Sequence, residues 1–395
     1  MKLEAIGNLV GLVRQCDPAT LGRGWINYLD ISSIDRESKR IVAAERIVAS
    51  GAPSRARQLV RSNDVLISTV RPNLNAVALV PPHFDGDIAS TGFCVLRPSE
   101  DQVCPGYLFY FTQTSRFVSH LTKISTGASY PAVTDSDVLE TNIPLPSLAE
   151  QQRITAQLDV ADRLRHARRY ALELSDKFLA AAFLKLFGDP KVNPERWPTQ
   201  CLSDACLKFS DGPFGSNLKS EHYRPAGVRV VRLNNIGVGE FLDDDQAFIS
   251  LDHFATLRKH ECLPGDVLIG TLGDPNLRAC ILPPKIKVAL NKADCVQART
   301  DPRKATPEYL SGLLNIPSTL NLVPGMAHGQ TRTRVSMGEL AELPIPVPPL
   351  SKQQQFAVLV AHHERLRATE REGLRQAEHL FQGLLQRAFS KVTQC

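Results

Sequence analysis

Two short segments carry residue types that take part in catalysis on nucleic-acid bases, but neither completes the pattern that this chemistry requires. Such a centre needs Asn or Asp, then two prolines and an aromatic ring, because the polar side chain holds the flipped base and the ring stacks on it. The segments Asn193-Pro194-Glu195-Arg196 and Asp274-Pro275-Asn276-Leu277 lack the second proline and the ring. We therefore expect no catalytic residues of this kind in the chain.

Two further patterns resemble ligand sites without meeting the requirements of one. The stretch Gly215-Ser216-Asn217-Leu218-Lys219-Ser220 has the Lys-Ser pair of a phosphate loop but no glycine directly before the lysine. His362 and His363 are adjacent within an expected helix, where neighbouring side chains point in different directions and cannot share a metal ion. The sequence predicts a chain that is not an enzyme, with no cofactor and no metal site.

Composition narrows the class of protein further. Lys and Arg number 46 against 41 Asp and Glu, so the net charge of +5 allows local basic patches but not a polycationic coat. The nine cysteines form no CxxC pair and are odd in number, which is typical of reduced thiols in a cytosol. No apolar run approaches the length of a membrane span. We expect a cytoplasmic protein that does not contact a membrane.

The elements that position any binding residues come from an internal repeat with a displacement of 202 residues. Registration over such a distance indicates duplicated domains rather than short solenoid units. The matching pairs of segments are 25–34 with 227–236, 63–69 with 265–271, 107–108 with 309–310, 143–148 with 345–350, and 151–152 with 353–354. Each copy has a strand-rich part, a proline-rich turn and then a long polar helix.

The two helices are expected at about 149–187 and 351–389. Their apolar residues step by three and four, which gives each helix one apolar stripe. A helix of about 37 residues spans roughly 55 Å, more than its own domain can cover, so the two helices are expected to pack antiparallel as a coiled coil. Two independent amphipathic helices, each covering its own domain, are the alternative. The predicted seam or partner-binding residues are Ile154, Leu158, Leu164 and Phe178 with Phe356, Leu359, Leu366 and Leu380.

The predicted fold class is α+β, with two globular strand-rich domains separated by two long antiparallel helices and related by a pseudo-two-fold repeat. The expected boundaries are 1–148 for the first recognition domain, 149–190 for the first spacer helix, 191–350 for the second domain and 351–395 for the second helix. Because the two domains differ in sequence, paired sites on them would bind different halves of a split, asymmetric target.

Four segments bring the chain to a known family. They are Ile143-Pro144-Leu145-Pro146-Ser147-Leu148-Ala149-Glu150-Gln151-Gln152-Arg153-Ile154, its echo at 345–354, Leu186-Phe187-Gly188-Asp189-Pro190, and Asp211-Gly212-Pro213-Phe214-Gly215-Ser216-Asn217-Leu218-Lys219. In their order along the chain they resemble the conserved regions of type I restriction-modification specificity subunits. The first domain has no counterpart of the Gly-Pro-Phe-Gly-Ser segment, and the second helix begins Ser-Lys-Gln-Gln instead of Ala-Glu-Gln-Gln.

The resemblance implies that each domain reads one half of a bipartite site in double-stranded DNA. It implies two copies of an adenine methyltransferase subunit docked on the central helices and, in a full complex, a translocating restriction endonuclease subunit. The alternative is a two-domain scaffold that binds proteins and never touches DNA, whose DNA affinity would show no steep salt dependence. A third class, an enzyme with an unfamiliar site, predicts methyl transfer by the purified chain alone.

Candidate DNA contacts lie on loops rich in Arg, Asn, Gln, Lys, Ser and Thr, which donate hydrogen bonds to base edges and phosphates. Pro213, Phe214 and Gly215 are expected to shape a turn. In the first domain the candidates are Arg55, Arg57, Arg71, Asn73, Asn75, Lys123, Ser129 and Tyr130. In the second domain they are Ser216, Asn217, Lys219, Asn276, Arg278, His328, Gln330, Thr331, Arg332 and Arg334.

Overall fold

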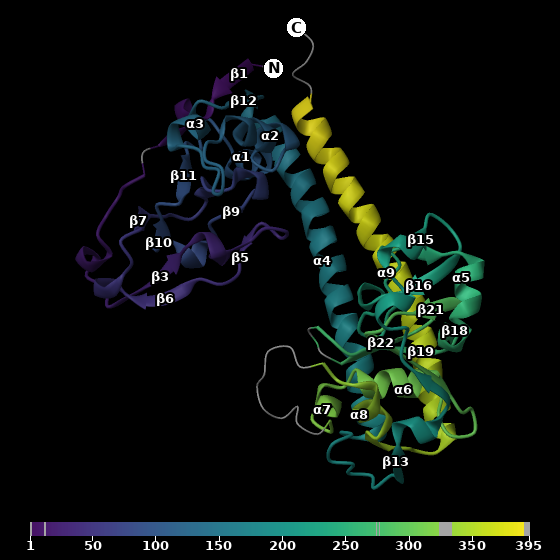
Figure 1. Ribbon diagram of the computed structural model, residues 1–395. Helices are drawn as coiled ribbons and strands as arrows, with labels where there is room; N and C mark the ends of the chain where they lie inside the picture. Colours follow the sequence, from purple (N-terminus) through teal and green to yellow (C-terminus); the bar gives the residue numbers. More distant parts are fainter. Residues whose placement is uncertain (1, 12, 274, 276, 324–333, 391–395) are drawn as a thin grey trace. The chain divides into compact units, whose positions relative to one another are not determined.

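The computed structural model describes residues 2–11, 13–273, 275, 277–323 and 334–390. The chain divides into two compact units, Met1–Tyr170 with Arg371–Cys395, and Ala171–Glu370 (Figure 1). Each unit therefore combines a continuous globular segment with parts of two long helices. We describe the units separately.

The first unit builds its globular part from short strands in four sheets. The strands are β1 (Lys2–Ala5), β2 (Val10–Gly11), β3 (Trp25–Leu29), β4 (Ile34–Asp35), β5 (Arg40–Ile41), β6 (Glu45–Val48), β7 (Ala56–Leu59), β8 (Val65–Ser68), β9 (Val77–Leu79), β10 (Ile88–Ser90), β11 (Phe93–Pro98) and β12 (Asn142–Leu145). Their sheet orders are β1-β12, β6-β3-β10-β7, β2-β11-β8-β9 and β4-β5.

Helices cover the β2-β11-β8-β9 sheet and close the main core of this unit. They are α1 (Pro105–Phe111), α2 (Ser115–Ile124), α3 (Asp135–Leu139) and the first part of α4 (Leu148–Phe187). The core joins Tyr107 of α1 and Leu158 of α4 to Phe381, Leu385 and Phe389 from the last part of α9 (Leu350–Ser390). The end of the chain is thus part of the first unit because its phenylalanines complete that core.

The second unit repeats this plan with its own strands and helices. The strands are β13 (Thr199–Cys201), β14 (Cys206–Ser210), β15 (Tyr223–Arg224), β16 (Val228–Val231), β17 (Phe248–Ile249), β18 (Glu261–Cys262), β19 (Val267–Gly270), β20 (Arg278–Ile281), β21 (Ala289–Asn291), β22 (Cys295–Thr300) and β23 (Pro344–Pro346). The sheet orders are β13-β23, β14-β22-β19-β20 and β15-β17-β16-β21-β18.

The helices of the second unit are α5 (Leu251–Thr256), α6 (Pro307–Leu314), α7 (Pro317–Leu320) and α8 (Met337–Ala341), together with the last part of α4 and the first part of α9. Its main core packs Phe183 and Phe187 of α4 and Phe356 of α9 around Tyr309 of α6. Aliphatic residues such as Leu310 and Leu313 complete this core, so both cores mix aromatic and aliphatic side chains.

The structure preserves the 202-residue repeat at the level of strand register. Phe93 pairs with Ser68 in the first unit, and Cys295 pairs with Gly270 in the second. A buried ion pair also recurs, because Arg97 binds both carboxylate oxygens of Asp64 and Arg299 binds both of Asp266. The same displacement therefore relates hydrogen bonds as well as sequence.

Each long helix begins at a buried glutamine that holds three backbone groups. The Gln353 amide nitrogen donates to the carbonyl oxygens of Lys304 (3.0 Å) and Pro348 (2.8 Å), and its oxygen accepts from the Thr306 amide (2.9 Å). Gln151 makes the equivalent set with Gln102, Pro146 and Cys104. The doubled Gln-Gln segment thus locks the start of each helix to the loop before α1 or α6.

Helices α4 and α9 pack together within each unit. In the first unit Arg165 of α4 lies over the Phe381 ring at 3.8 Å, and Arg169 donates to Glu378 at 2.5 Å. In the second unit the Phe178 ring stacks on His363 with 5.6 Å between ring centroids. The start of α4 therefore meets the end of α9 and the end of α4 meets its start, so the helices run antiparallel, and the predicted α+β fold with two long packed helices is confirmed.

The contact between the helices differs from the predicted apolar seam. Ile154, Leu158 and Phe356 are buried, whereas Leu359 is half-buried. Leu164, Phe178, Leu366 and Leu380 are 41%, 47%, 49% and 45% exposed. The apolar seam is therefore only partly present, because arginine, histidine and phenylalanine fill much of the helix contact. A partner-binding role for the exposed residues, which the sequence also allowed, stays a prediction.

Candidate nucleic-acid interface

Backbone hydrogen bonds bring the predicted loops of the first unit together at the end of β8. The Thr69 amide donates to the Gly92 carbonyl oxygen (3.0 Å), and the Val133 amide donates to the Thr69 carbonyl oxygen (2.9 Å). The Thr91 amide donates to the carbonyl oxygen of Arg55 (2.8 Å). We call this assembly, residues 55, 69–75, 91–92 and 125–133, the first loop edge.

An arginine and a tyrosine from two of these loops form the most prominent contact of the first loop edge. The Arg71 guanidinium lies 4.6 Å from the centroid of the Tyr130 ring, which is 68% exposed. The Arg71 backbone has a φ of +51° and its amide donates to the Pro131 carbonyl oxygen at 2.7 Å. This unusual backbone aims a cationic and an aromatic group outward together, which suits hydrogen bonding to bases and stacking.

The remaining candidates of the first unit differ in how free their side chains are. Arg57 lies 3.9 Å from Asp17 and also donates to its neighbour's carbonyl oxygen, so part of its guanidinium is committed to the fold. Asn75 accepts the Lys39 ammonium on its backbone oxygen at 2.6 Å. The exposed candidates are Arg55, Asn73, Lys123 and Ser129.

The second unit builds an equivalent assembly at the end of β19. The Thr271 amide donates to the Asp294 carbonyl oxygen (3.3 Å), and the Val335 amide donates to the Thr271 carbonyl oxygen (3.1 Å). These bonds are displaced by 202 residues from those of Thr69. We call residues 211–219, 232–235, 271, 292–294 and 334–335 the second loop edge.

The Gly-Pro-Phe-Gly-Ser segment reaches this edge by a close backbone approach. A β-carbon on Gly212 would lie 2.3 Å from both the Asn291 oxygen and the Lys292 carbonyl carbon, so only glycine fits. Phe214 beyond it is 47% exposed, and the Arg334 guanidinium lies 5.4 Å from its ring. Arg334 also pairs with Asp294 at 3.3 Å and donates to the Ala293 carbonyl oxygen at 3.1 Å.

Two histidines in ring contact hold the other end of this segment. The His222 and His253 rings lie 4.1 Å apart, the His253 Nε2 is 2.9 Å from the Asn217 carbonyl oxygen, and the Lys219 amide donates to His222 Nδ1 at 3.1 Å. The side chains of Ser216, Asn217 and Lys219 remain exposed. The fold therefore fixes the backbone of this segment and leaves its polar side chains available.

One predicted contact is replaced by a structural role. Arg278 donates to the carbonyl oxygens of Ile236, Leu233, Leu272 and Pro275. A guanidinium with four of its five donors taken up by backbone oxygens holds the loops together and has one N–H left for any other partner. The predicted residues Asn276, His328, Gln330, Thr331 and Arg332 lie outside the described residues.

Sequence reasoning missed two exposed or half-buried polar residues at the second loop edge, Asn234 and Lys292. Both follow strands that read as core segments, β16 and β21, which run parallel with Val231 opposite Asn291. Carboxyl ends of parallel strands meet at one edge, so the two side chains are brought together there. For Asn234 a signal is present in the sequence: it lies in the polar turn that follows residues 227–231, within a segment that matches across the internal repeat.

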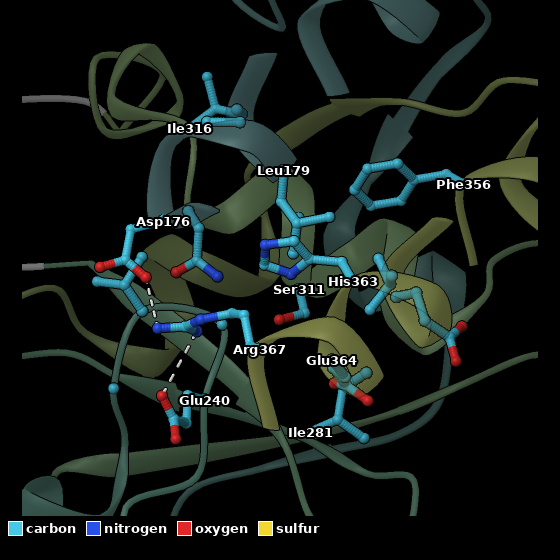
Figure 2. Close-up of a pocket in the computed structure, with 18 of the residues that line it drawn as sticks. Asp176, Leu179, Glu240, Ile281, Ser311, Ile316, Phe356, His363, Glu364 and Arg367 are labelled. Atoms are coloured by element: carbon cyan, nitrogen blue, oxygen red, sulfur yellow. Dashed lines mark ion pairs between the residues drawn. The ribbon is translucent and has the colours of Figure 1, made fainter. Parts of the chain in front are cut away.

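A cavity of about 400 Å³ lies in the second unit between α4, α6 and α9. Figure 2 shows Arg367 between Asp176 and Glu240, to which it is ion-paired, with Glu364 and His363 on the same helix. Burial and the nearby Glu308 raise the pKa of Glu364. Gly312 lines this cavity, and the position displaced by 202 residues in the first unit is Tyr110. The Tyr110 hydroxyl donates a hydrogen bond to Asp159 at 2.6 Å.

Two kinds of site are absent from the described residues. They contain no group of three or more His, Cys, Asp and Glu side chains placed to hold a metal ion. Among them no helix is long and apolar enough to cross a membrane.

Comparisons with known proteins find sequence similarity to one family. Residues 34–174 match the family model for the type I restriction modification DNA specificity domain. The HindI specificity subunit of Haemophilus influenzae is 23% identical over 45% of this chain, and the MjaIX specificity subunit of Methanocaldococcus jannaschii is 27% identical over 54%. The chain covers 39% and 51% of the lengths of these two relatives.

A solved structure extends the similarity over the whole chain. It comes from work on the complex assembly and conformational transition of the type I R-M system, with 26% identity, a TM-score of 0.61 and coverage of 98% of this chain and 97% of that one. The family model, the named relatives and this structure point to the same family. Over its length the chain is thus similar to the specificity subunits of type I restriction-modification systems.

Proposed function

We propose that this chain recognises a bipartite, asymmetric sequence in double-stranded DNA, with one loop edge reading each half. The observation that carries the proposal is the duplicated loop edge. Thr69 and Thr271 hold the same backbone bonds, while the side chains around them differ: Arg71 and Tyr130 in one unit, Phe214 and Arg334 in the other. A shared scaffold with unlike donors is what two different half-sites require.

The same arrangement supports a role in which this chain recognises DNA without modifying it. The side chains at the loop edges are suited to donating hydrogen bonds and stacking, and the chemistry then belongs to partners. We propose that an adenine methyltransferase subunit and, in the full complex, a restriction subunit act at the site that this chain selects.

The outer surface of the long helices supports two copies of the methyltransferase subunit. Leu164 of α4 is displaced by 202 residues from Leu366 of α9, and Phe178 of α4 likewise from Leu380 of α9. The first unit thus exposes Leu164 and Leu380, and the second exposes Leu366 and Phe178. Equivalent exposed apolar side chains in both units suit two copies of the same partner, because such side chains favour burial in an interface.

Methylated adenines mapped in cells with and without this gene product identify the target sequence. The purified full chain, alone and with its host's methyltransferase subunits, is then titrated with duplexes carrying that sequence or a scrambled one. We expect preference for the target and a steep fall of affinity with salt, because bound phosphates release counterions. A scaffold that binds only proteins shows equal, weak affinity for both duplexes and no steep salt dependence, and that result would exclude the proposal.

A further inference from the structure

A small hollow on the second loop edge contains hydrogen-bond donors that make no hydrogen bond or ion pair within the described part of the chain. It has a volume of about 170 Å³ and is lined by Arg232, Asn234, Asp245, Lys292 and Asp294, among others. Asn234 belongs to the turn that follows β16, and Lys292 follows β21 directly. The Lys292 amide donates to the Val231 carbonyl oxygen at 2.9 Å, which joins the two strand ends.

Ion pairs distinguish the cations around this hollow. Arg232 pairs with Asp245, and Arg334 pairs with Asp294. Within the described part of the chain, no ion pair or hydrogen bond is recorded for the Lys292 ammonium or the Asn234 side-chain amide. The arginines are therefore largely neutralised by aspartates, while Lys292 retains its charge and Asn234 its donors for a ligand.

The hollow has a rigid frame. Gly212 sits directly on the backbone of Asn291 and Lys292, so the Gly-Pro-Phe-Gly-Ser segment fixes the position of the lysine backbone. Phe214 and Arg334 flank it from the same segment and from the end of the loop before α8. Recognition of a base edge needs hydrogen-bond donors on a fixed backbone, because a misplaced donor loses its hydrogen bond.

The repeat supplies an internal comparison. At the positions displaced by 202 residues the first unit has Asp30, Ser32, Ser90 and Gly92 in place of Arg232, Asn234, Lys292 and Asp294. Ser90 is buried and accepts the Gly92 amide at 3.2 Å, and Ser32 donates to Asp30 at 2.8 Å. These side chains serve the local structure of the first unit, so the two units differ in chemistry at this place.

We propose that Lys292 and Asn234 are specificity residues of the second unit that read base edges in its half of the DNA sequence. The inference rests on the proposed function and adds the residues and the chemistry. An ammonium donates to the O6 and N7 acceptors of guanine, and a carboxamide accepts from the N6 amino group of adenine through its oxygen and donates to N7 through its nitrogen.

The test replaces each residue by its counterpart in the first unit, Lys292→Ser and Asn234→Ser, in the full chain with its methyltransferase subunits. Lys285→Ser is the matched control, since Lys285 is a lysine of the same unit that pairs with Asp243 at 2.7 Å. Duplexes carry every single base-pair change in both half-sites. We expect each variant to lose about 10- to 100-fold affinity for the original site and to stop discriminating at one or two base pairs of one half-site.

Three outcomes would contradict these claims. Discrimination that stays intact at every position overturns the proposal, and so does a uniform loss on all duplexes, which identifies a phosphate contact. If the unsubstituted chain shows no sequence preference, the proposed function fails before the variants are considered. Melting curves establish that each variant is folded, and Asn234→Ser, a change on an exposed turn, keeps the test decisive if Lys292→Ser is unstable.

Discussion

Replacing Gln353 with leucine is expected to destabilise the second unit, because the glutamine side chain is fully buried and holds three backbone groups. Leucine leaves the Thr306 amide and the carbonyl oxygens of Lys304 and Pro348 without these partners. At about 1 kcal/mol for each hydrogen bond, the free energy of unfolding falls by about 3 kcal/mol, and by more where a group stays buried without a partner. In a unit of the size of residues 171–370 this lowers the melting midpoint by about 6–12 °C.

The neighbouring Gln354 supplies the control, because it is exposed on the same turn of α9. Gln354→Leu should change the free energy of unfolding by no more than about 0.5 kcal/mol. Urea and thermal unfolding followed by circular dichroism compare the two variants with the unsubstituted chain. Equal stability of Gln353→Leu and Gln354→Leu would refute the view that this glutamine anchors the helix start.

Three further predictions concern positions where the two units differ or where a loop is tightly packed. Gly212→Ala should weaken recognition of the half-site read by the second unit and leave the other half unchanged in a duplex-binding assay, since its β-carbon would meet the Asn291 and Lys292 backbone; equal effects on both halves would contradict this. Gly312→Ala should lower the free energy of unfolding by about 1–3 kcal/mol in denaturant titrations, because its β-carbon would lie 2.8 Å from the Phe356 ring. Gly383→Ala, at an open position of α9, should raise it by about 0.5–1 kcal/mol. A change of the same sign in both variants would be inconsistent with the packing. Burial and, secondarily, Arg165 lower the pKa of Lys39 from 10.5 to about 8. The unfolded chain therefore binds more protons than the folded chain between these pH values, and the free energy of unfolding should rise from pH 8 to 10.5. A Lys39→Met variant that keeps the whole of this rise would exclude Lys39 as its source.

The duplicated fold could be predicted because its signal is repeated and long. The segments 63–69 and 265–271 became β8 and β19 in the same register, and the expected helices were found at Leu148–Phe187 and Leu350–Ser390. The composition of the helix contact could not be predicted, because apolar spacing does not distinguish a residue that faces a domain core from one that faces a partner helix. Leu164 and Leu158 lie on one stripe, yet only Leu158 is buried.

The candidate interface was predictable as a set of loops but not residue by residue. Arg71 and Tyr130 are 59 positions apart in sequence, and their contact depends on the pairing of Val70 with Ala132. Arg278 has the composition of a DNA-binding residue, but its donors bind backbone oxygens that fold around it. Lys292 escaped attention because it follows a short apolar strand, and only the parallel pairing of β16 and β21 places it beside Asn234.

The measurement that tests the central claim most directly is a map of methylated adenines made after residues 1–142 are exchanged for the corresponding segment of a relative with a different target. Cells carry either the original or the exchanged chain together with the same methyltransferase subunit. If each unit reads its own half-site, one half of the methylated sequence changes and the other half stays as it was. A change in both halves, or in neither, would contradict the account.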